Sequence, residues 1–263
     1  MPRWRQAVER SYLKWEWHRR MASYRVKMSN SNYTAEWTRR RWGIECQTLY
    51  PPIESDFREV AKTPLILSVG RFALAGEGHT KKQPEMLAAF RRLHEGGLDG
   101  WEYFSVGSLR DSPAHREHLA RLREAAGSAP ARLVPNIRRG ELKDLYERAS
   151  IFWHAAGYGE DTDARPELAE HFGMSTVEAM AAGCVPVVIN KGGQTEIVQH
   201  GVNGFLWETP EELAEYTRLL AGDARLRARM SEAARTRARA FSREEFVRRF
   251  YELMGPLLKS REP

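Results

Sequence analysis

The stretch that decides the fold of this chain runs from Glu170 to Pro186 and reads Glu-His-Phe-Gly-Met-Ser-Thr-Val-Glu-Ala-Met-Ala-Ala-Gly-Cys-Val-Pro. Its two carboxylates, Glu170 and Glu178, are eight residues apart, and an apolar strand over 185–189 follows at once. A helix that begins at the Phe-Gly step would place the free N–H groups of its first turn beside Glu170. Such N–H groups suit a phosphate, and carboxylates accept hydrogen bonds from sugar hydroxyls. The stretch therefore indicates a site for a ligand that is both phosphorylated and rich in hydroxyls.

Strands and helices alternate along the chain from Pro64 onward. Continuous apolar runs such as Leu65–Val69 are typical of strands that are buried on both faces of a parallel sheet. Amphipathic segments of helical length lie between these runs. The pattern predicts an α/β fold, a Rossmann-like parallel sheet with helices on both faces. The predicted strands are 65–69, 102–106, 132–134, 151–154, 185–189 and 204–207, and the predicted helices are 83–94, 114–126, 141–149, 172–182, 192–199, 210–221, 224–240 and 243–258.

Extra helices are expected at both ends of the chain. A helix over 3–22 is unusually aromatic for a solvated helix, and a short strand is expected over 24–28. Asn32–Thr34 resembles a cap for a helix that continues to Arg41 and ends before Gly43. The closing helix is amphipathic, with apolar side chains at Phe246, Phe250, Met254 and Leu257.

The positive charge of the chain is concentrated at its ends. The net charge is +6, yet residues 1–45 carry eleven Lys/Arg against four Asp/Glu and residues 224–263 carry eleven against five. No nucleic-acid-binding motif accompanies this charge, so nucleic acid is not an expected partner. An anionic membrane surface, an acidic protein partner and plain solvated helix faces remain the alternatives.

The remaining bulk features favour a cytoplasmic protein. The two cysteines, Cys46 and Cys184, have neither metal-binding nor redox spacing, and Cys184 lies in an apolar stretch. No run of about 18 apolar residues predicts a membrane span. The N-terminus lacks the apolar segment of a secretory signal.

Ordered motifs from about Met28 to the C-terminus resemble the family 4 (group 1) retaining glycosyltransferases. The resemblance implies the GT-B architecture of two facing Rossmann-like domains. It divides the chain into a remnant of the N-terminal domain and linker (1–60), a donor-binding domain (61–240) and a closing helix (241–263). The acceptor-binding half would then come from another polypeptide, or the chain is a fragment. The motifs are Ser29-Asn-Ser31, Tyr50-Pro-Pro52, Val69-Gly-Arg71, Lys81, Glu170 to Pro186, and Gly192-Gly193 with Glu196.

Two cations are expected to bind a diphosphate. Arg71 follows a buried strand and Gly70, at the sheet edge where open α/β sheets bind ligands. Lys81 comes ten residues later, and the resemblance assigns both to stabilising the departing nucleoside diphosphate. The loop 72–80 is longer than in typical relatives, and Lys82 adjoins Lys81. The alternative is that both are ordinary surface cations.

The resemblance also assigns the donor contacts. Glu170 matches the carboxylate that contacts the donor sugar, so it joins Arg71 and Lys81 as a catalytic candidate, and Glu178 matches the one that contacts the ribose. Ile137 lies where relatives bind the nucleobase through the main chain. His154 and His171 are equally compatible with a donor contact and with a structural role. The backbone contacts are expected from Phe172, Gly173, Met174 and Ser175.

No metal or other cofactor is expected. Asp161-Thr-Asp163 mimics a metal-binding Asp-x-Asp motif but lies in a polar loop, where a solvated acidic segment is the simpler explanation. Gly192-Gly193, with Gln194 and Glu196, is expected either to border the donor or acceptor pocket or to serve only as a turn and a helix start.

The resemblance thus implies the donor half of a transferase that moves a hexose from a nucleotide sugar, of the GDP-mannose or UDP-glucose type, with retention. The Glu-His-Phe-Gly-Met form of the motif favours mannosyltransferase-like relatives, with a lipid-linked or polysaccharide acceptor. A cytoplasmic location is expected, with peripheral contact at the inner membrane face. The alternative is a non-catalytic nucleotide-sugar-binding or scaffold module.

Overall fold

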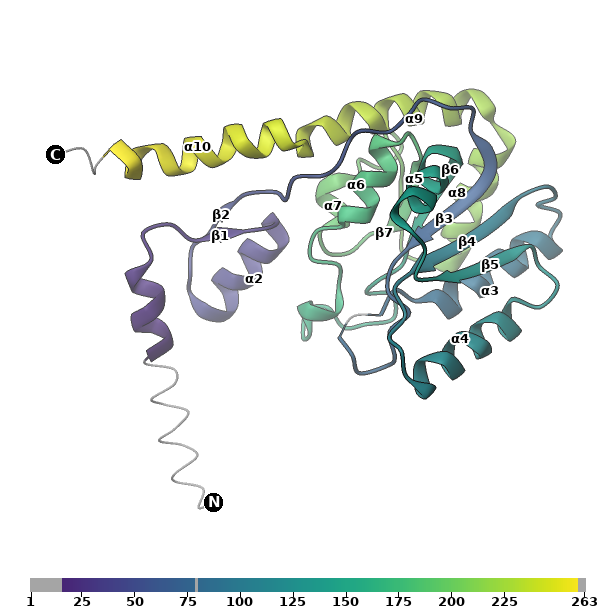
Figure 1. Ribbon diagram of the computed structural model, residues 1–263, viewed down its shortest axis with the longest axis horizontal. Helices are drawn as coiled ribbons and strands as arrows, with labels where there is room; N and C mark the ends of the chain where they lie inside the picture. Colours follow the sequence, from purple (N-terminus) through teal and green to yellow (C-terminus); the bar gives the residue numbers. More distant parts are fainter. Residues whose placement is uncertain (1–15, 79, 260–263) are drawn as a thin grey trace, which may run out of the picture.

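Six parallel strands form the centre of the molecule (Figure 1). The structure is a computed structural model that describes residues 16–259 except His79. The strand order across the sheet is β5-β4-β3-β6-β7-β8. Renumbered from β3, this is the 3-2-1-4-5-6 order of a Rossmann domain, so the predicted fold is confirmed. The strands are β3 (Thr63–Val69), β4 (Glu102–Gly107), β5 (Ala131–Pro135), β6 (Ala149–His154), β7 (Val185–Ile189) and β8 (Phe205–Trp207).

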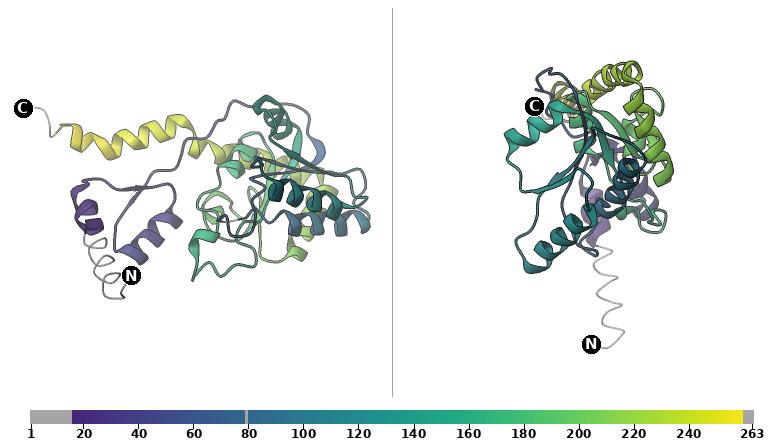
Figure 2. Two further views of the ribbon diagram at one scale, coloured as in Figure 1. Left: turned by 60° about the horizontal axis from the view of Figure 1, so that its bottom comes forward. Right: turned by 90° about the vertical axis from the view of Figure 1, so that its right-hand side faces the viewer.

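Helices cover both faces of this sheet (Figure 2). One face packs against α3 (Gln83–Glu95), α4 (Pro113–Ala126) and α8 (Pro210–Gly222). The other packs against α5 (Arg139–Arg148), α6 (Met174–Ala181) and α9 (Ala224–Ala238). Short elements η1 (Pro166–Leu168), α7 (Gln194–Ile197) and η2 (Arg239–Phe241) lie between them, and α10 (Arg243–Lys259) closes the chain.

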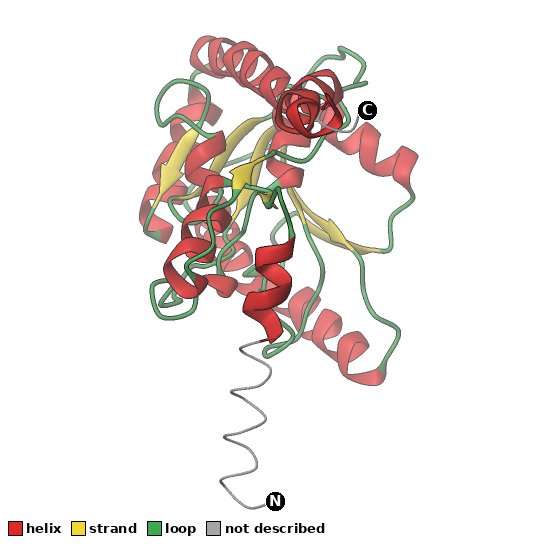
Figure 3. Ribbon diagram, turned by 90° about the vertical axis from the view of Figure 1, so that its left-hand side faces the viewer, coloured by secondary structure: helices red, strands yellow, loops and turns green. Residues whose placement is uncertain are grey.

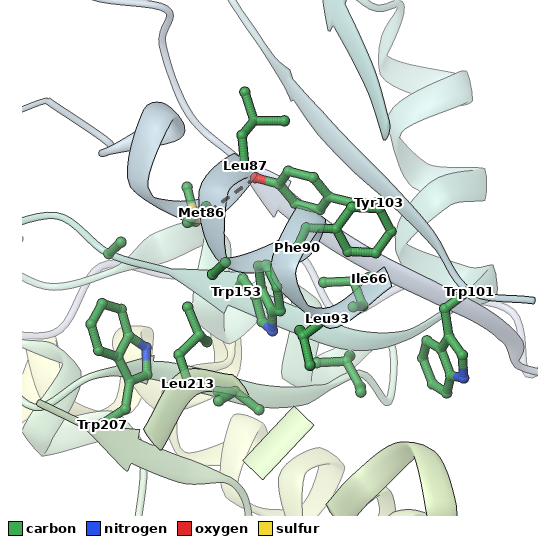
Figure 4. Close-up of a cluster of buried hydrophobic side chains, with 14 of the residues drawn as sticks. Ile66, Met86, Leu87, Phe90, Leu93, Trp101, Tyr103, Trp153, Trp207 and Leu213 are labelled. Atoms are coloured by element: carbon green, nitrogen blue, oxygen red, sulfur yellow. Dashed lines mark hydrogen bonds between the residues drawn. The ribbon is translucent and has the colours of Figure 1, made fainter. Parts of the chain in front are cut away.

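An aromatic cluster fills the first of these two interfaces (Figure 4). Trp153 of β6 packs against Tyr103 of β4 and Phe90 of α3, with ring centroids 5.4 and 6.4 Å away. The buried polar atoms of two of these rings are satisfied, because Trp153 Nε1 donates to Thr217 Oγ1 at 3.0 Å and the Tyr103 hydroxyl lies 2.7 Å from Ser68 Oγ. Polar pairing of this kind lets bulky aromatic side chains be buried without loss of stability.

Residues 28–48 form a separate small unit. Here β1 (Met28–Ser29) pairs in parallel with β2 (Gln47–Thr48), and α2 (Asn32–Trp42) connects them (Figure 3). We call these elements the N-terminal unit. Residues 16–23 are helical, whereas the predicted helix residues 3–15 lie outside the described part of the chain.

Several predicted boundaries were wrong by one to a few residues. The cap of α2 is Ser31, whose side chain accepts the N–H of Thr34 at 2.9 Å, and not the segment 32–34. The strand expected over 24–28 is only Met28–Ser29. The helix expected from Phe172 begins at Met174, because Gly173 has a φ of 117°, outside the helical range.

The closing helix α10 extends away from the six-stranded sheet, toward the side that carries the N-terminal unit (Figure 1). Its predicted amphipathic pattern includes Leu257, whose side chain lies outside the described residues. Across the part of the chain that the structure describes, no helix combines the length and the apolar character that a membrane span requires.

Candidate active site

The candidate site lies where the strand order of the sheet reverses. Chain connections leave β3 toward β4 on one side, and β6 begins the run to β7 on the other. Crevices at such switch points, beyond the carboxyl ends of the strands, are the usual ligand sites of open α/β sheets. Gly70 and Arg71 follow β3 there, and His154 ends β6.

Close packing at the end of β3 positions the two predicted cations. A Cβ on Gly70 would lie 2.4 Å from Cγ of Lys81, so the Lys81 side chain crosses directly over Gly70. A Cβ on Gly107 would lie 2.0 Å from the Gly70 oxygen. The buried Gln83 side chain donates to the main-chain carbonyl oxygen of Arg71 at 2.9 Å, which fixes the backbone there. Only glycine permits this approach of backbone and side chain.

Glu170 is brought together with Lys81 and His154. Its Oε2 accepts from Lys81 Nζ in an ion pair and lies 3.0 Å from His154 Nε2. Its side chain is only 14% exposed. Burial alone would raise the pKa of this carboxyl, but the hydrogen bond and charge of His154 and the charge of Lys81 outweigh burial and hold the pKa far below its usual range.

The pKa of His154 determines how its ring contacts Glu170. Burial lowers this pKa and outweighs the raising effect of the neighbouring Glu170. We favour a neutral ring, since His154 is fully buried and Lys81 already supplies a cation to Glu170. In that state Nε2–H donates to the carboxylate, which remains an acceptor only.

The Gly192-Gly193 turn packs against the main chain of the segment that begins at Glu170. The N–H of Gly193 donates to the main-chain carbonyl oxygen of Glu170 at 2.8 Å. A Cβ on Gly192 would lie 2.3 Å from that same oxygen, and one on Gly193 would lie 2.5 Å from the oxygen of His171. The turn therefore orients residues 170–172, and whether it also borders a donor or acceptor pocket stays a prediction.

The start of α6 presents main-chain N–H groups beside Glu170. The Gly173 oxygen accepts the N–H groups of Thr176 and Val177 at 3.0 and 3.2 Å, which leaves those of Met174 and Ser175 at the helix N-terminus. Met174 is 51% exposed, so this end of the helix is accessible. One turn later, Glu178 accepts from the buried Tyr146 hydroxyl at 2.8 Å. Burial raises the pKa of Glu178.

Ile137 follows a strained residue that sequence reasoning passed over. Asn136 has a positive φ of 53°, and its side chain reaches both the N–H and the oxygen of Leu109, at 2.9 and 3.4 Å. Asparagine tolerates this conformation better than most residues. The clamp fixes the backbone from which the half-buried Ile137 projects, beyond the end of β5. The only sequence signal for this turn is the asparagine itself, directly after an apolar strand.

The structure separates the two neighbouring lysines. Lys81 pairs with Glu170, whereas Lys82 Nζ pairs with Glu160 at 2.6 Å in the loop that precedes Glu170. Asp161, in the same loop, accepts the N–H groups of Asp163 and Ala164 at 3.2 and 3.0 Å, which is a local turn. Among the described residues, no group of three or more His, Cys, Asp or Glu side chains is placed to hold a metal ion.

Glu196 does not lie in the site but joins two parts of the molecule. Its carboxylate accepts the N–H groups of Asn32 and Tyr33 at 2.8 and 2.6 Å and the Tyr50 hydroxyl at 2.8 Å. The Tyr50 ring stacks on Phe172 with centroids 5.4 Å apart. Glu196 thus caps α2 from a distant segment, which its reading as part of a local helix start did not anticipate.

Comparisons with known proteins agree with one another. A profile of the family described as glycosyl transferases group 1 matches residues 52–237. The chain is 27% identical over 254 residues to the GDP-Man:Man(3)GlcNAc(2)-PP-Dol alpha-1,2-mannosyltransferase of Dictyostelium discoideum, covering 89% of this chain and 48% of that protein. It is 30% identical over 234 residues to the D-inositol 3-phosphate glycosyltransferase of Xylanimonas cellulosilytica, covering 83% and 51%.

Solved structures share the fold. Sucrose-phosphate synthase of Thermosynechococcus elongatus superposes with a TM-score of 0.70 at 20% identity, covering 89% of this chain and 58% of that one. Anabaena Alr3699/HepE in complex with UDP and glucose does so with a TM-score of 0.70 at 17% identity, covering 88% and 63%. The chain spans about half the length of the curated relatives it matches.

Proposed function

The chain belongs to the group 1 glycosyl transferases, and from that premise we propose that it is the donor-binding half of a retaining hexosyltransferase. The observation that carries the proposal is the meeting of Lys81, Glu170 and His154 at the switch point of the sheet, beside the N-terminus of α6. Cations, an ionised carboxylate and free N–H groups are what a diphosphate bonded to a hydroxyl-rich sugar requires.

Arg71 and Lys81 are proposed to neutralise the negative charge that develops on the diphosphate as the sugar departs. Preorganised charges of this kind stabilise a transition state without reorganisation. An incoming diphosphate competes with Glu170 for the Lys81 ammonium, and its arrival frees Glu170 to accept a sugar hydroxyl. The N–H groups of residues 172–175 complete the donor contacts, with Ile137 at the base and Glu178 at the ribose.

The donor is proposed to be a nucleotide sugar of the GDP-mannose or UDP-glucose type. The name of one relative specifies GDP-Man and a PP-Dol substrate, and one structural neighbour was solved with UDP and glucose. A lipid-linked or polysaccharide hydroxyl is the proposed acceptor. No metal is required by this proposal, because the two cations already supply positive charge to the diphosphate.

The surface around the N-terminal unit is proposed to meet an acceptor-binding half, whether on the same or another polypeptide. A parallel sheet of two short strands is far below the width at which parallel sheets are normally stable, and among the described residues no third strand pairs with either edge. The extended α10 lies on the same side (Figure 1).

A peripheral contact with an anionic membrane is proposed for the basic N-terminal side, at the cytoplasmic face. Trp17 and Trp42 are 41% and 51% exposed, and their ring centroids lie 6.1 Å apart. Three exposed arginines, Arg39 to Arg41, end α2 beside them. Exposed tryptophans next to cations are typical of membrane interfaces.

Calorimetric titration with GDP, UDP, GDP-mannose and UDP-glucose tests the donor site. We expect one nucleotide to bind, and the double variant Arg71→Ala/Lys81→Ala to lose at least about 100-fold in affinity, since each charged hydrogen bond contributes about 1.5–3 kcal/mol. Lys82→Ala is the matched control and should bind normally, because Lys82 pairs with Glu160. Equal binding by all three proteins would refute the assignment of the cations.

Transfer activity distinguishes the enzyme from the alternative, a non-catalytic nucleotide-sugar-binding or scaffold module. Donor binding without turnover, in the presence of an acceptor and a candidate acceptor-binding half, would favour the module. Retention of anomeric configuration in the product, measured by NMR, tests the stereochemistry.

A further inference from the structure

The loop between the two proposed cations is tied to a helix that lies outside the donor site. Residues 72–80, all described except His79, connect Arg71 to Lys81, and the Lys81 side chain returns to lie against Gly70, the residue before Arg71. Within the loop, Glu77 Oε2 accepts the N–H of Leu74 at 3.2 Å, which closes a local turn. The same carboxylate reaches outward to α4 and to the segment before it.

The strongest outward contact of Glu77 is with His115, in the first turn of α4. His115 Nε2 lies 2.9 Å from Glu77 Oε2, and the other ring nitrogen, Nδ1, lies 2.8 Å from the Ser112 hydroxyl. Ser112 also caps α4 by accepting the N–H of His115 at 3.4 Å. With Nε2–H donating to the carboxylate and Nδ1 accepting from Ser112, every polar atom of the ring is satisfied.

Burial decides which contact of Glu77 matters most. The His115 side chain is 4% exposed, so its hydrogen bond to Glu77 is shielded from water and held in one geometry. Arg110 also pairs with Glu77, at 2.9 Å, but its side chain is 71% exposed. Exposed ion pairs contribute little. The anchor is therefore the chain Glu77–His115–Ser112, with Arg110 as a minor addition.

The anchor extends to the segment that is proposed to hold the nucleobase. The N–H of Phe72 donates to the Ser108 oxygen at 2.9 Å, so the loop also follows the segment after β4. Asn136 clamps Leu109 in that same segment. The loops beyond β3, β4 and β5 are thereby linked into one support, from the cation pair to Ile137.

We propose that Glu77 is a positioning residue that sets the spacing between Arg71 and Lys81 by holding their connecting loop against His115. This proposal rests on the donor site described above. A long loop that is free at its centre must lose conformational freedom when its two ends grip one diphosphate, and a preformed anchor removes most of that cost. Glu77 acts through the two cations and does not itself contact the ligand.

The positioning role of Glu77 is tested by comparing how its substitution changes the affinities for a nucleoside diphosphate and for a nucleoside monophosphate. The two cations are proposed to bind the diphosphate, so Glu77→Gln should weaken binding of the nucleoside diphosphate about fivefold to tenfold, because glutamine replaces a charge-assisted hydrogen bond to His115 by a neutral one that is about half as strong. It should change binding of the matching nucleoside monophosphate less than about twofold, because a monophosphate cannot engage two cations whose spacing suits a diphosphate. Both affinities are measured by calorimetry on the full chain.

Matched variants keep the test decisive. His115→Asn should reproduce the loss, and the double variant should be no weaker than the weaker single variant, because both substitutions act on the same hydrogen bond. Glu77→Asp, which keeps the charge, should recover part of the affinity, and Arg110→Ala should bind nearly as the unmodified chain does. Asp111→Asn controls for charge, since Asp111 pairs only with Arg116 among the contacts that the structure describes for it.

Two results would overturn the proposal. One is unchanged diphosphate affinity in Glu77→Gln. The other is an equal loss for diphosphate and monophosphate, which would indicate a general structural role. Failure of the donor site itself is recognised separately, because the unmodified chain would then bind neither nucleotide.

Discussion

The six-stranded region and the N-terminal unit both contain parallel β–α–β connections, but different interactions stabilise them. In the six-stranded region (63–238), β6 is buried at every position and its helices pack on two hydrophobic clusters. In the N-terminal unit, the strands are two residues long and α2 has no buried residue. Polar contacts attach this unit instead, chiefly the Glu196 carboxylate at the start of α2.

The difference shows that a parallel sheet needs width before its own core stabilises it. A strand in the middle of a wide sheet has neighbours on both edges and helices on both faces, so burial is nearly complete. A two-stranded parallel sheet has none of these, and its stability depends on what holds it in place. The N-terminal unit is therefore expected to open locally without unfolding the rest.

The largest expected effect comes from truncating the aromatic core. Trp153→Ala should cost about 3–5 kcal/mol of unfolding free energy, because it leaves a cavity beside Phe90 and Tyr103 and removes one of the two hydrogen bonds of the Thr217 hydroxyl. Trp37→Ala, in the half-buried face of α2, should cost less than about 1 kcal/mol. Urea denaturation measures both. Similar costs for the two substitutions would erase the contrast between the regions.

Loss of the Glu196 contacts should produce the next largest effect, and a local one. Glu196→Gln weakens three hydrogen bonds to the N-terminal unit, so exchange of amide hydrogens over 28–48 should accelerate about 10- to 100-fold. The urea midpoint of the six-stranded region should shift little. Glu215→Gln is the control, since Glu215 is an exposed carboxylate on α8. If exchange accelerated equally throughout the chain, the two regions would be one cooperative unit.

Acidification should affect the six-stranded region through His154. Burial lowers the pKa of His154, so the unfolded chain binds a proton more readily than the folded chain does. Stability should therefore fall as pH drops from 7 to 5 through the unfolded value near 6.5, by at most about 1.4 kcal/mol per pH unit. Glu170, whose pKa is depressed, remains charged in this window and loses its contribution only below about pH 4.

His154→Gln should flatten the slope of stability between pH 7 and 5, measured by urea denaturation at each pH. An unchanged slope would mean that another group carries the dependence. The exchange rates of the N-terminal unit, corrected for intrinsic pH effects, should not follow the His154 titration.

The smallest effects are expected from the helix caps. Ser112 caps α4 and Ser31 caps α2, and each substitution to alanine should cost about 1 kcal/mol. Ser112→Ala should lower the global free energy of unfolding, whereas Ser31→Ala should appear only as faster exchange within 28–48. A global loss from Ser31→Ala would contradict the independence of the N-terminal unit.

The six-stranded region could be predicted well from the sequence because its signals are local. The apolar run 185–189 identifies β7 without knowledge of its neighbours in space. In the same way, Gly173 marks the start of α6, and Gly192-Gly193 marks the turn before α7. Errors were confined to ends of elements, where capping geometry decides the boundary. The short strand β1 was misplaced, since two residues carry no periodicity.

The sequence proposed members for the site but did not predict their contacts. The resemblance selected Lys81 over Lys82, and the structure places Lys81 on Glu170 and Lys82 on Glu160. Adjacent lysines in a loop are alike in sequence, because the direction of each side chain depends on the backbone that carries it.

The sequence by itself determined the order of strands and helices, the glycines that let backbone segments approach, and the family to which the chain belongs, because these depend on patterns within short windows. Only the tertiary structure decided that Glu170 meets His154 and Lys81, that Glu77 meets His115, and that Glu196 caps a helix 163 residues away. The physical reason is that each of these carboxylates finds its partner through the packing of the sheet, and no local pattern specifies which distant N–H group or cation that packing will bring within reach.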